Sequence, residues 1–405
     1  MKMQRLRSIP GIVHPSLEAR HQPSGSEVRF NGSGLAFAEY VARNRDMLRN
    51  AHSANGAADL EKIVNGNAPF ELKPPSGFPP GKNKTYRRGV LLTHGLSDSP
   101  YSMRYLAAFF QQNGFRVMAI LLPGHGTQPG DLLTVSWHEW AATLAYGVDK
   151  LAEEVDEVYL AGYSVGGALS VYQSLCDSRV RGLFLFSPAF RITQWAAWAD
   201  LHKFYSWLIP SAKWVDIMPD RDIYKYESFT KNAAAQTHAL TTELAARLRQ
   251  CALDIPVFTV ASEDDVTVKI SATLEFMARA RHSSSKLVVY TTEPEKRTDE
   301  FAEKVKLEWV NSVIPEQKIL SSAHTAIVMP PEDAHYGVAG EYSNCVHYYP
   351  GDIEQYTACI KNPSADFQGE VTEGNLKAGI LRRLMYNPNF AALKVSMQQF
   401  IDALP

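Results

Sequence analysis

The chain is poor in cysteine, and its cysteines are far apart. Its 405 residues include only Cys176, Cys251, Cys345 and Cys359, and no two of them form a CxxC pair. This spacing excludes the common zinc and redox motifs. We therefore expect reduced, mostly buried thiols in a cytoplasmic protein, with Cys345 and Cys359 as the pair to watch in an exported one.

The chain also lacks net charge and long apolar runs. Its 41 Lys and Arg against 43 Asp and Glu leave a formal charge of −2, which gives no basic surface for nucleic acid or an anionic membrane. No stretch approaches 18 apolar residues, and the start, "MKMQRLRSIPGIVHPS", lacks the apolar run of a secretory signal. We expect a small-molecule substrate, no nucleic-acid partner and no transmembrane segment.

Short apolar runs do occur, and from residue 88 they alternate with amphipathic segments. Alternation of this kind is typical of an α/β fold with a mostly parallel sheet between two layers of helices. The sequence predicts a final helix in "NPNFAALKVSMQQFIDAL" and strands in "GVLLTH", "FRVMAILL", "EVYLAG", "VRGLFLFSP", "PVFTVAS", "SKLVVYT" and, as the last one, "QKILSS".

Two interruptions of this alternation define the expected domains. Residues 1–87 form an N-terminal extension on the core, 88–190 and 254–405 form the core with a C-terminal extension, and 191–253 form an inserted cap. The cap is rich in aromatic side chains, which suit either a lid over an apolar pocket or the core of the insertion itself. They are Trp195, Trp198, Phe204, Tyr205, Trp207 and Trp214.

The motif Gly162-Tyr163-Ser164-Val165-Gly166 has the pattern Gly-x-Ser-x-Gly between a predicted strand and a predicted helix. In that context the glycines permit a sharp turn that projects the serine hydroxyl above the sheet. The alternative is a serine that only caps the helix. We expect Ser164 to be a nucleophile.

A nucleophilic serine needs a base, and the base needs an acid to orient it. The acid should follow a later strand, and "PVFTVASEDDVTV" offers Asp264 and Asp265 there. The spacing from Ser262 to Val268 favours Asp265, which leaves Asp264 solvated or in a supporting hydrogen bond.

The base should follow the last strand, where "QKILSSAHTAI" places His324 between small residues. His335 and His347 lie further along and are weaker candidates. Two backbone N–H groups, those of Val165 and Leu96, are the expected donors to an oxyanion, while His94 is expected to be hydrogen-bonded to loop backbone.

Other motifs fail on inspection. The glycine-rich "LLPGHGTQPGDL" lacks the lysine and the Ser or Thr of a phosphate loop, and the "HEW" at His138 lacks the second histidine of a zinc motif. We expect no metal and no organic cofactor.

With these residues in place, the chain resembles the α/β-hydrolase superfamily, in particular its carboxylesterase, monoacylglycerol lipase and lysophospholipase branch. The matching segments "LLTHGLSDSP", "LLPGHGTQPGDL", "GYSVGG", "PVFTVASEDD" and "SSAHT" occur in the family's order. The resemblance implies an eight-stranded, mostly parallel sheet, a cap, and ester hydrolysis through an acyl-enzyme. By motif it implies the triad Ser164, Asp265 and His324.

The function we expect is therefore a serine carboxylesterase for short to medium acyl esters. A monoacylglycerol lipase or lysophospholipase would use the same mechanism. An aminopeptidase would need an acidic group for the substrate ammonium, such as Asp216, Asp220 or Asp222, and the fold also hosts non-catalytic binding proteins.

Overall fold

A computed structural model describes residues 16–26, 34–54, 56, 59–191, 210–297, 305–362 and 366–405. Its centre is an eight-stranded sheet in which β1 is antiparallel to its neighbour and the other strands are parallel. In spatial order the strands are β1 (Phe70–Leu72), β3 (Phe115–Ile120), β2 (Tyr86–Thr93), β4 (Val155–Tyr163), β5 (Val180–Phe186), β8 (Val257–Ser262), β9 (Lys286–Thr291) and β10 (Lys306–Asn311).

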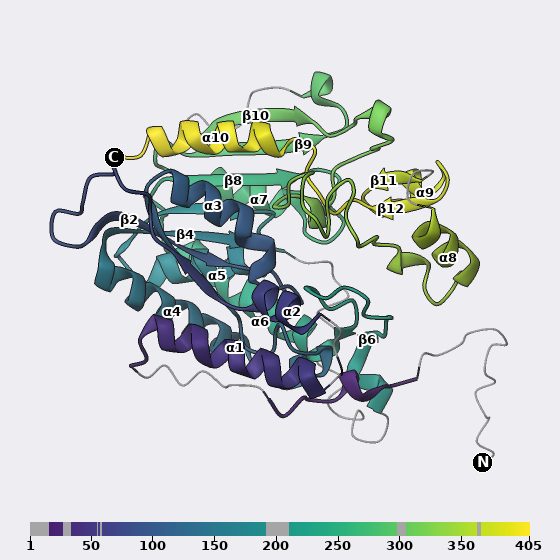
Figure 1. Ribbon diagram of the computed structural model, residues 1–405. Helices are drawn as coiled ribbons and strands as arrows, with labels where there is room; N and C mark the ends of the chain where they lie inside the picture. The colour runs from purple at the N-terminus through teal and green to yellow at the C-terminus, as the bar shows by residue number, and fades with distance from the viewer. Residues whose placement is uncertain are drawn as a thin grey trace, which may run out of the picture.

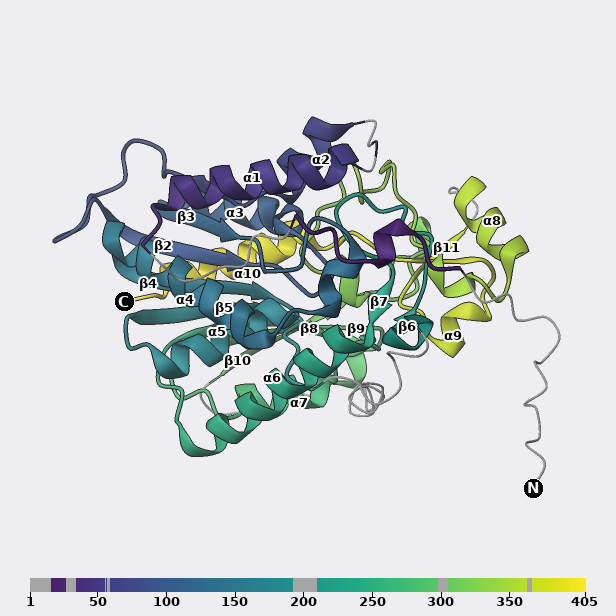
Figure 2. The same cartoon turned by 90° about the horizontal axis from the view of Figure 1, so that it is seen from below.

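Helices cover both faces of this sheet (Figures 1 and 2). Helices α3 (Arg104–Gln112) and α10 (Phe390–Asp402) pack on one face. The other face carries α1 (Phe37–Ala54), α4 (Trp137–Glu154), α5 (Val165–Cys176), α6 (Lys231–Gln250) and α7 (Ile270–Met277). The central strands are apolar on both sides because both sides are buried. The α/β fold expected from the sequence is confirmed.

Six of the predicted strands and the final helix are present, but the last strand was misplaced. "QKILSS" lies outside the sheet, and the eighth strand is β10, whose sequence is "KLEWVN". This strand lies at the edge of the sheet and is half-exposed, so it carries Lys306 and Glu308 in place of a continuous apolar run.

The N-terminal segment contributes directly to the sheet. Its Pro/Gly-rich stretch contains β1, which pairs with β3 at the sheet edge, and α2 (Leu60–Asn67) packs beside α1. A strand of three residues is too short to show a hydrophobic pattern, and so β1 could not be predicted from the sequence.

The inserted segment is described from residue 210 onward. It contains the two-stranded pair β6 (Trp214–Asp216) and β7 (Phe229–Thr230), followed by α6. Trp214 is buried with its ring 5.0 Å from that of His21, so it fills a local core. The other five aromatic residues expected in a lid, Trp195, Trp198, Phe204, Tyr205 and Trp207, lie outside the described residues.

The described residues between 330 and α10 lie beyond the carboxyl ends of the strands (Figure 1). It contains α8 (Ile353–Lys361), α9 (Glu373–Leu376) and the parallel pair β11 (Phe367–Gly369) and β12 (Leu381–Arg383). A disulfide joins Cys345 to Cys359 within it.

The expectation of four reduced, mostly buried cysteines is therefore wrong. Cys345 and Cys359 are fully buried but bonded to each other, while the two free thiols, Cys176 and Cys251, are exposed. Sequence spacing could not reveal the bond, because a disulfide requires the two Cα atoms to lie close together, and only the folded segment brings them to 6.1 Å. Among the described helices, none has the length and apolar character that crossing a bilayer requires.

Candidate active site

Ser164 lies on the sharp turn between β4 and α5. Its φ of 54° and ψ of −116° are unusual for a residue with a side chain. The turn requires glycine on both sides of the serine. A Cβ on Gly162 would lie 2.2 Å from the carbonyl oxygen of Gly166, and a Cβ on Gly166 would lie 2.2 Å from that of Thr93. This backbone holds the hydroxyl at the carboxyl edge of the sheet.

The fold brings Ser164, His324 and Asp265 together. His324 lies in a 3₁₀ turn, η8 (His324–Ala326), after the last strand, and its Nε2 is 3.0 Å from Ser164 Oγ. Its Nδ1 is 2.6 Å from Asp265 Oδ2. A carboxylate only accepts hydrogen bonds, so the imidazole donates from Nδ1 and its Nε2 is free to accept from the serine hydroxyl.

Asp265 is held as a charged acceptor. Besides His324, it accepts hydrogen bonds from the N–H groups of Thr267 at 2.8 Å and Val268 at 2.9 Å. Burial acts to raise the pKa of Asp265, but the charge of His324 and these hydrogen bonds outweigh it and lower the pKa below its ordinary value.

Asp264 faces away from the histidine. Its Oδ2 accepts from Ser312 Oγ at 3.0 Å, and burial raises its pKa to about 6. Of the two acids that the sequence offered, Asp265 is therefore the one in contact with His324, and Asp264 joins the strand end to a neighbouring loop.

The two residues expected to supply oxyanion donors lie at the same pocket as Ser164. Val165 and Leu96 both line it, and neither N–H donates to any residue that the structure describes. His94 fixes the loop that carries Leu96, because its Nδ1 donates to Gly95 O at 2.8 Å and its Nε2 accepts from Leu122 N–H at 3.0 Å. The expected contact of His94 with loop backbone is confirmed.

The C-terminal extension contacts the backbone of His324. The fully buried side chain of Glu370 accepts from His324 N–H at 3.0 Å, and Arg383 pairs with Glu370 through Nε at 2.7 Å and Nη2 at 3.0 Å. Arg383 also donates to Thr267 Oγ1 at 2.8 Å. Neither Glu370 nor Arg383 could be predicted from the sequence, because they belong to no motif and approach His324 only in the folded chain.

A cavity of about 310 Å³ opens above Ser164. Its walls come from the loop that carries Leu96, the inserted segment and the C-terminal extension. The side chains from these last two segments that line it include Asp222, Lys225, Tyr226, Glu227, Phe229, Ala234, Thr237, Tyr342, Asn344, Val346 and Arg383.

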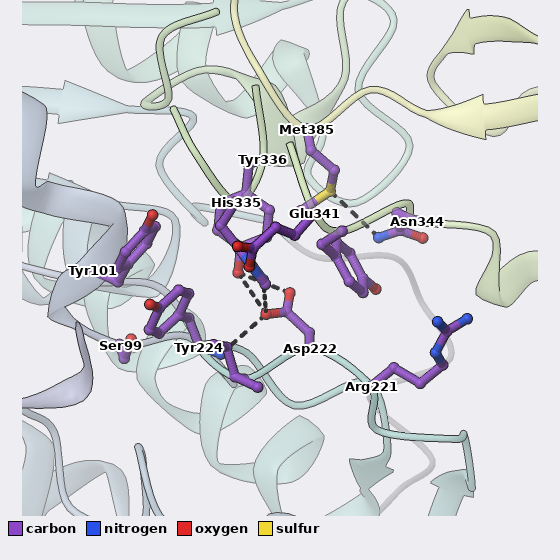
Figure 3. A network of polar contacts seen from close by, with 12 residues as sticks. Ser99, Tyr101, Arg221, Asp222, Tyr224, His335, Tyr336, Glu341, Asn344 and Met385 are labelled. Atoms are coloured by element: carbon purple, nitrogen blue, oxygen red, sulfur yellow. Dashed lines mark hydrogen bonds and ion pairs between the residues drawn. The ribbon is translucent and has the colours of Figure 1, made fainter. Parts of the chain in front are cut away.

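Asp222 lies at the centre of a polar network in the cavity wall (Figure 3). Its oxygens accept from Tyr336 Oη at 2.8 and 2.9 Å, His335 Nε2 at 3.0 Å and the N–H of Tyr224 at 3.0 Å. His335 is therefore engaged with Asp222, whereas the histidine that contacts Ser164 is His324.

The other acids considered for the binding of an ammonium group lie elsewhere. Asp220 is held by Arg20 and Ser228, and Asp216 is not among the described residues that line the cavity. In the described part of the chain, no group of three His, Cys, Asp or Glu side chains is arranged to hold a metal ion.

Comparisons with known proteins find similar sequences and structures. A thermostable monoacylglycerol lipase of Bacillus sp. (strain H-257) is 28% identical over 192 residues, which cover 46% of this chain and 75% of the relative. A structure of the metagenome-derived lipolytic enzymes LipS and LipT aligns with a TM-score of 0.45 and 21% identity over 60% of this chain and 87% of that one. The monoacylglycerol lipase of Paleococcus ferrophilus aligns with a TM-score of 0.43 and 14% identity over 60% and 88%.

A family model matches residues 84–292, which is more than half of the chain and includes the whole turn around Ser164. It describes hydrolases of the serine aminopeptidase S33 type. The protein belongs to this family of α/β-hydrolase enzymes.

Proposed function

We propose that the protein hydrolyses carboxylic esters of short to medium acyl chains, with Ser164 as nucleophile, His324 as base and Asp265 as the orienting acid. The observation that carries the proposal is the pair of hydrogen bonds made by the His324 ring, 3.0 Å to Ser164 Oγ and 2.6 Å to Asp265 Oδ2. A serine is a weak nucleophile without such a base.

In this mechanism His324 Nε2 takes the proton of Ser164 as its Oγ attacks the ester carbonyl. The N–H groups of Leu96 and Val165 stabilise the oxyanion, a contribution of about 3 kcal/mol per donor in comparable enzymes. His324 then protonates the leaving alcohol, and water activated by His324 hydrolyses the acyl-enzyme. Asp265 stabilises the imidazolium throughout.

The size of the cavity supports a small ester. A volume of about 310 Å³ lies at the lower end of the range for ligand pockets. A monoacylglycerol is the alternative substrate, supported by the 28% identity to a monoacylglycerol lipase. The cap that we propose over residues 191–253 would then cover the longer acyl chain.

An aminopeptidase is the second candidate, because the carboxylate of Asp222 lines the cavity and the matching family model is named for such enzymes. Against it, Asp222 already accepts hydrogen bonds from Tyr336, His335 and Tyr224. A substrate ammonium would have to compete with these donors.

The test is labelling with a fluorophosphonate probe, followed by kinetics on a p-nitrophenyl ester series and on aminoacyl p-nitroanilides. We expect labelling of the wild type only, with none in Ser164→Ala, and a kcat/KM that peaks at short to medium esters. Labelling that persists in Ser164→Ala would refute the assignment. Preference for the anilides would favour the aminopeptidase, and an unlabelled wild type would favour a binding protein.

A cytoplasmic location stays a prediction, and the Cys345–Cys359 bond weighs against it. Disulfides persist mainly in oxidising compartments. Fractionation of cells that express the full chain, with thiol alkylation at lysis, would show where the protein lies and whether the bond is present there.

A further inference from the structure

Lys225 is a cation in the wall of the cavity above Ser164. Its side chain is partly buried, yet its ammonium makes no hydrogen bond and no ion pair with any residue in the described ranges. An ammonium has three donors. Lys225 therefore presents unused donors to the cavity.

The other charged side chains in this wall are already engaged. Arg383 makes two hydrogen bonds to Glu370, and Glu227 accepts from Tyr342 Oη at 2.6 Å. Asp222 is held by three donors (Figure 3). Among the described charged side chains that line the cavity, Lys225 is thus the one left for a ligand.

The electrostatic surroundings of Lys225 are mixed. Burial lowers the pKa of Lys225, and the carboxylate of Asp98 acts to raise it. Asp98 is itself buried, burial raises its pKa to about 6, and its carboxylate accepts a hydrogen bond from the N–H of Ser99 at 2.8 Å. A role of Lys225 as distant counter-ion of Asp98 is therefore the alternative that a test must separate.

A second polar side chain in the cavity wall has one atom without a partner. Asn344 is only 8% exposed, its Nδ2 contacts Met385 Sδ at 3.4 Å (Figure 3), and its Oδ1 has no hydrogen-bond partner. Leaving a buried amide unsatisfied costs about 1 to 3 kcal/mol. Because the amide oxygen is itself shielded from solvent, a ligand in the cavity could bond the amide only after the side chain turns, and the two ends of the amide could then exchange to suit that ligand.

We propose that Lys225, assisted by Asn344, forms a subsite for an anionic group on the substrate, a carboxylate or a phosphate. The inference rests on the proposed ester hydrolysis and specifies its substrate as an ester with a negative charge on its acyl or its alcohol part. Ser164 would attack the ester carbonyl while the Lys225 ammonium holds that charge.

Two matched pairs of esters test this subsite. Mono-p-nitrophenyl glutarate against its methyl ester places the charge on the acyl part, and 1-butyryl-glycerol 3-phosphate against 1-butyrylglycerol places it on the alcohol part. In the wild type, kcat/KM should favour the anionic member of at least one pair. In Lys225→Met that preference should fall about 10- to 100-fold, as expected for loss of a charge-assisted hydrogen bond.

Two further variants serve as references. Lys225→Arg should keep part of the preference because it keeps the charge. Lys84→Met removes an exposed lysine that does not line the cavity and should leave the preference unchanged. The subsite is refuted if no anionic ester is preferred in either pair, or if Lys225→Met lowers both members of a pair equally. An equal fall in kcat/KM for both esters of a pair would indicate that Lys225 acts as the counter-ion of Asp98.

A binding measurement separates this subsite from the proposed hydrolysis. Calorimetry with Ser164→Ala and mono-p-nitrophenyl glutarate or 1-butyryl-glycerol 3-phosphate should show binding that the added Lys225→Met change weakens about 10-fold or more. If the wild type hydrolyses none of the esters but this binding is found, the subsite stands and the hydrolysis fails. If hydrolysis is found but neither ligand's binding depends on Lys225, the subsite fails and the hydrolysis stands.

Discussion

The carboxylate of Asp265 lies 2.6 Å from the Nδ1 atom of His324, although 59 residues separate them along the chain. This contact fixes which nitrogen of the ring carries the proton. It also leaves Asp264, the next residue, directed toward Ser312.

Substituting these two neighbouring acids should therefore have unequal effects. We expect Asp265→Asn to lower kcat about 10⁴-fold, because the amide holds the imidazole in the wrong tautomer. Asp264→Asn should cost less than about tenfold, since it alters only a supporting hydrogen bond. Steady-state kinetics on one p-nitrophenyl ester measures both. A larger loss in Asp264→Asn would reverse the assignment.

Local sequence patterns were enough to predict much of the fold. Buried parallel strands such as β4 and β8 are continuous apolar runs, and the glycines around Ser164 are required by the turn itself. The two edge strands were not predicted, because β1 is very short and β10 is half-exposed.

The cavity wall could not be predicted in the same way. Lys225, Asn344 and Arg383 belong to no motif, and they line the cavity above Ser164 because the inserted segment and the C-terminal extension fold over the strand ends. Glu370 belongs to no motif either, and it contacts the backbone N–H of His324 outside the cavity. Such contacts depend on long-range packing. The local patterns of a single sequence do not show which distant residues come into contact in the folded chain.

The pair formed by Glu370 and Arg383 offers a second prediction. Glu370→Gln keeps the shape of the side chain but leaves the largely buried guanidinium of Arg383 without its anion. We expect the free energy of unfolding to fall by about 3 kcal/mol or more. We also expect kcat to fall with little change in KM, because Glu370 contacts the backbone of His324 and not the cavity.

Urea denaturation and kinetics below the unfolding range measure the two effects. Glu373→Gln, an exposed glutamate paired with Lys377, is the matched control and should change little. A double substitution, Glu370→Gln with Arg383→Gln, should be less destabilising than the sum of the two single changes. Strict additivity would contradict the pairing.

The disulfide should stabilise the cavity wall. Cys345 lies between Asn344 and Val346, which both line the cavity, and the bond closes a loop with a separation of 14 residues. Loss of such a cross-link costs about 3 kcal/mol. Cys345→Ser with Cys359→Ser should lower the melting temperature and raise KM more than it changes kcat.

The control for this change is Cys176→Ser with Cys251→Ser, which removes two exposed thiols and should leave both quantities unchanged. Thiol titration of the unfolded wild type should give two reactive thiols without reductant and four after reduction. Four thiols before reduction would show that the bond is absent.

Glu227 predicts how stability depends on pH. Burial raises its pKa from 4.5 to about 7, against the opposing hydrogen bonds from Tyr342 and the N–H of Arg221. Between these two pH values the folded state holds a proton that the unfolded state has lost, so the free energy of unfolding falls as pH rises through this window.

In Glu227→Gln the side chain stays neutral while its oxygen can still accept a hydrogen bond from Tyr342. We therefore expect this variant to gain about 1 to 3 kcal/mol over the wild type between pH 4.5 and pH 8. Urea denaturation across this range measures the difference, with the exposed Glu316→Gln as control. Asp98 and Asp264, whose pKa values are also raised to about 6 by burial, are present in both proteins and cancel in the comparison. Parallel curves of unfolding free energy against pH for Glu227→Gln and wild type would contradict the raised pKa of Glu227.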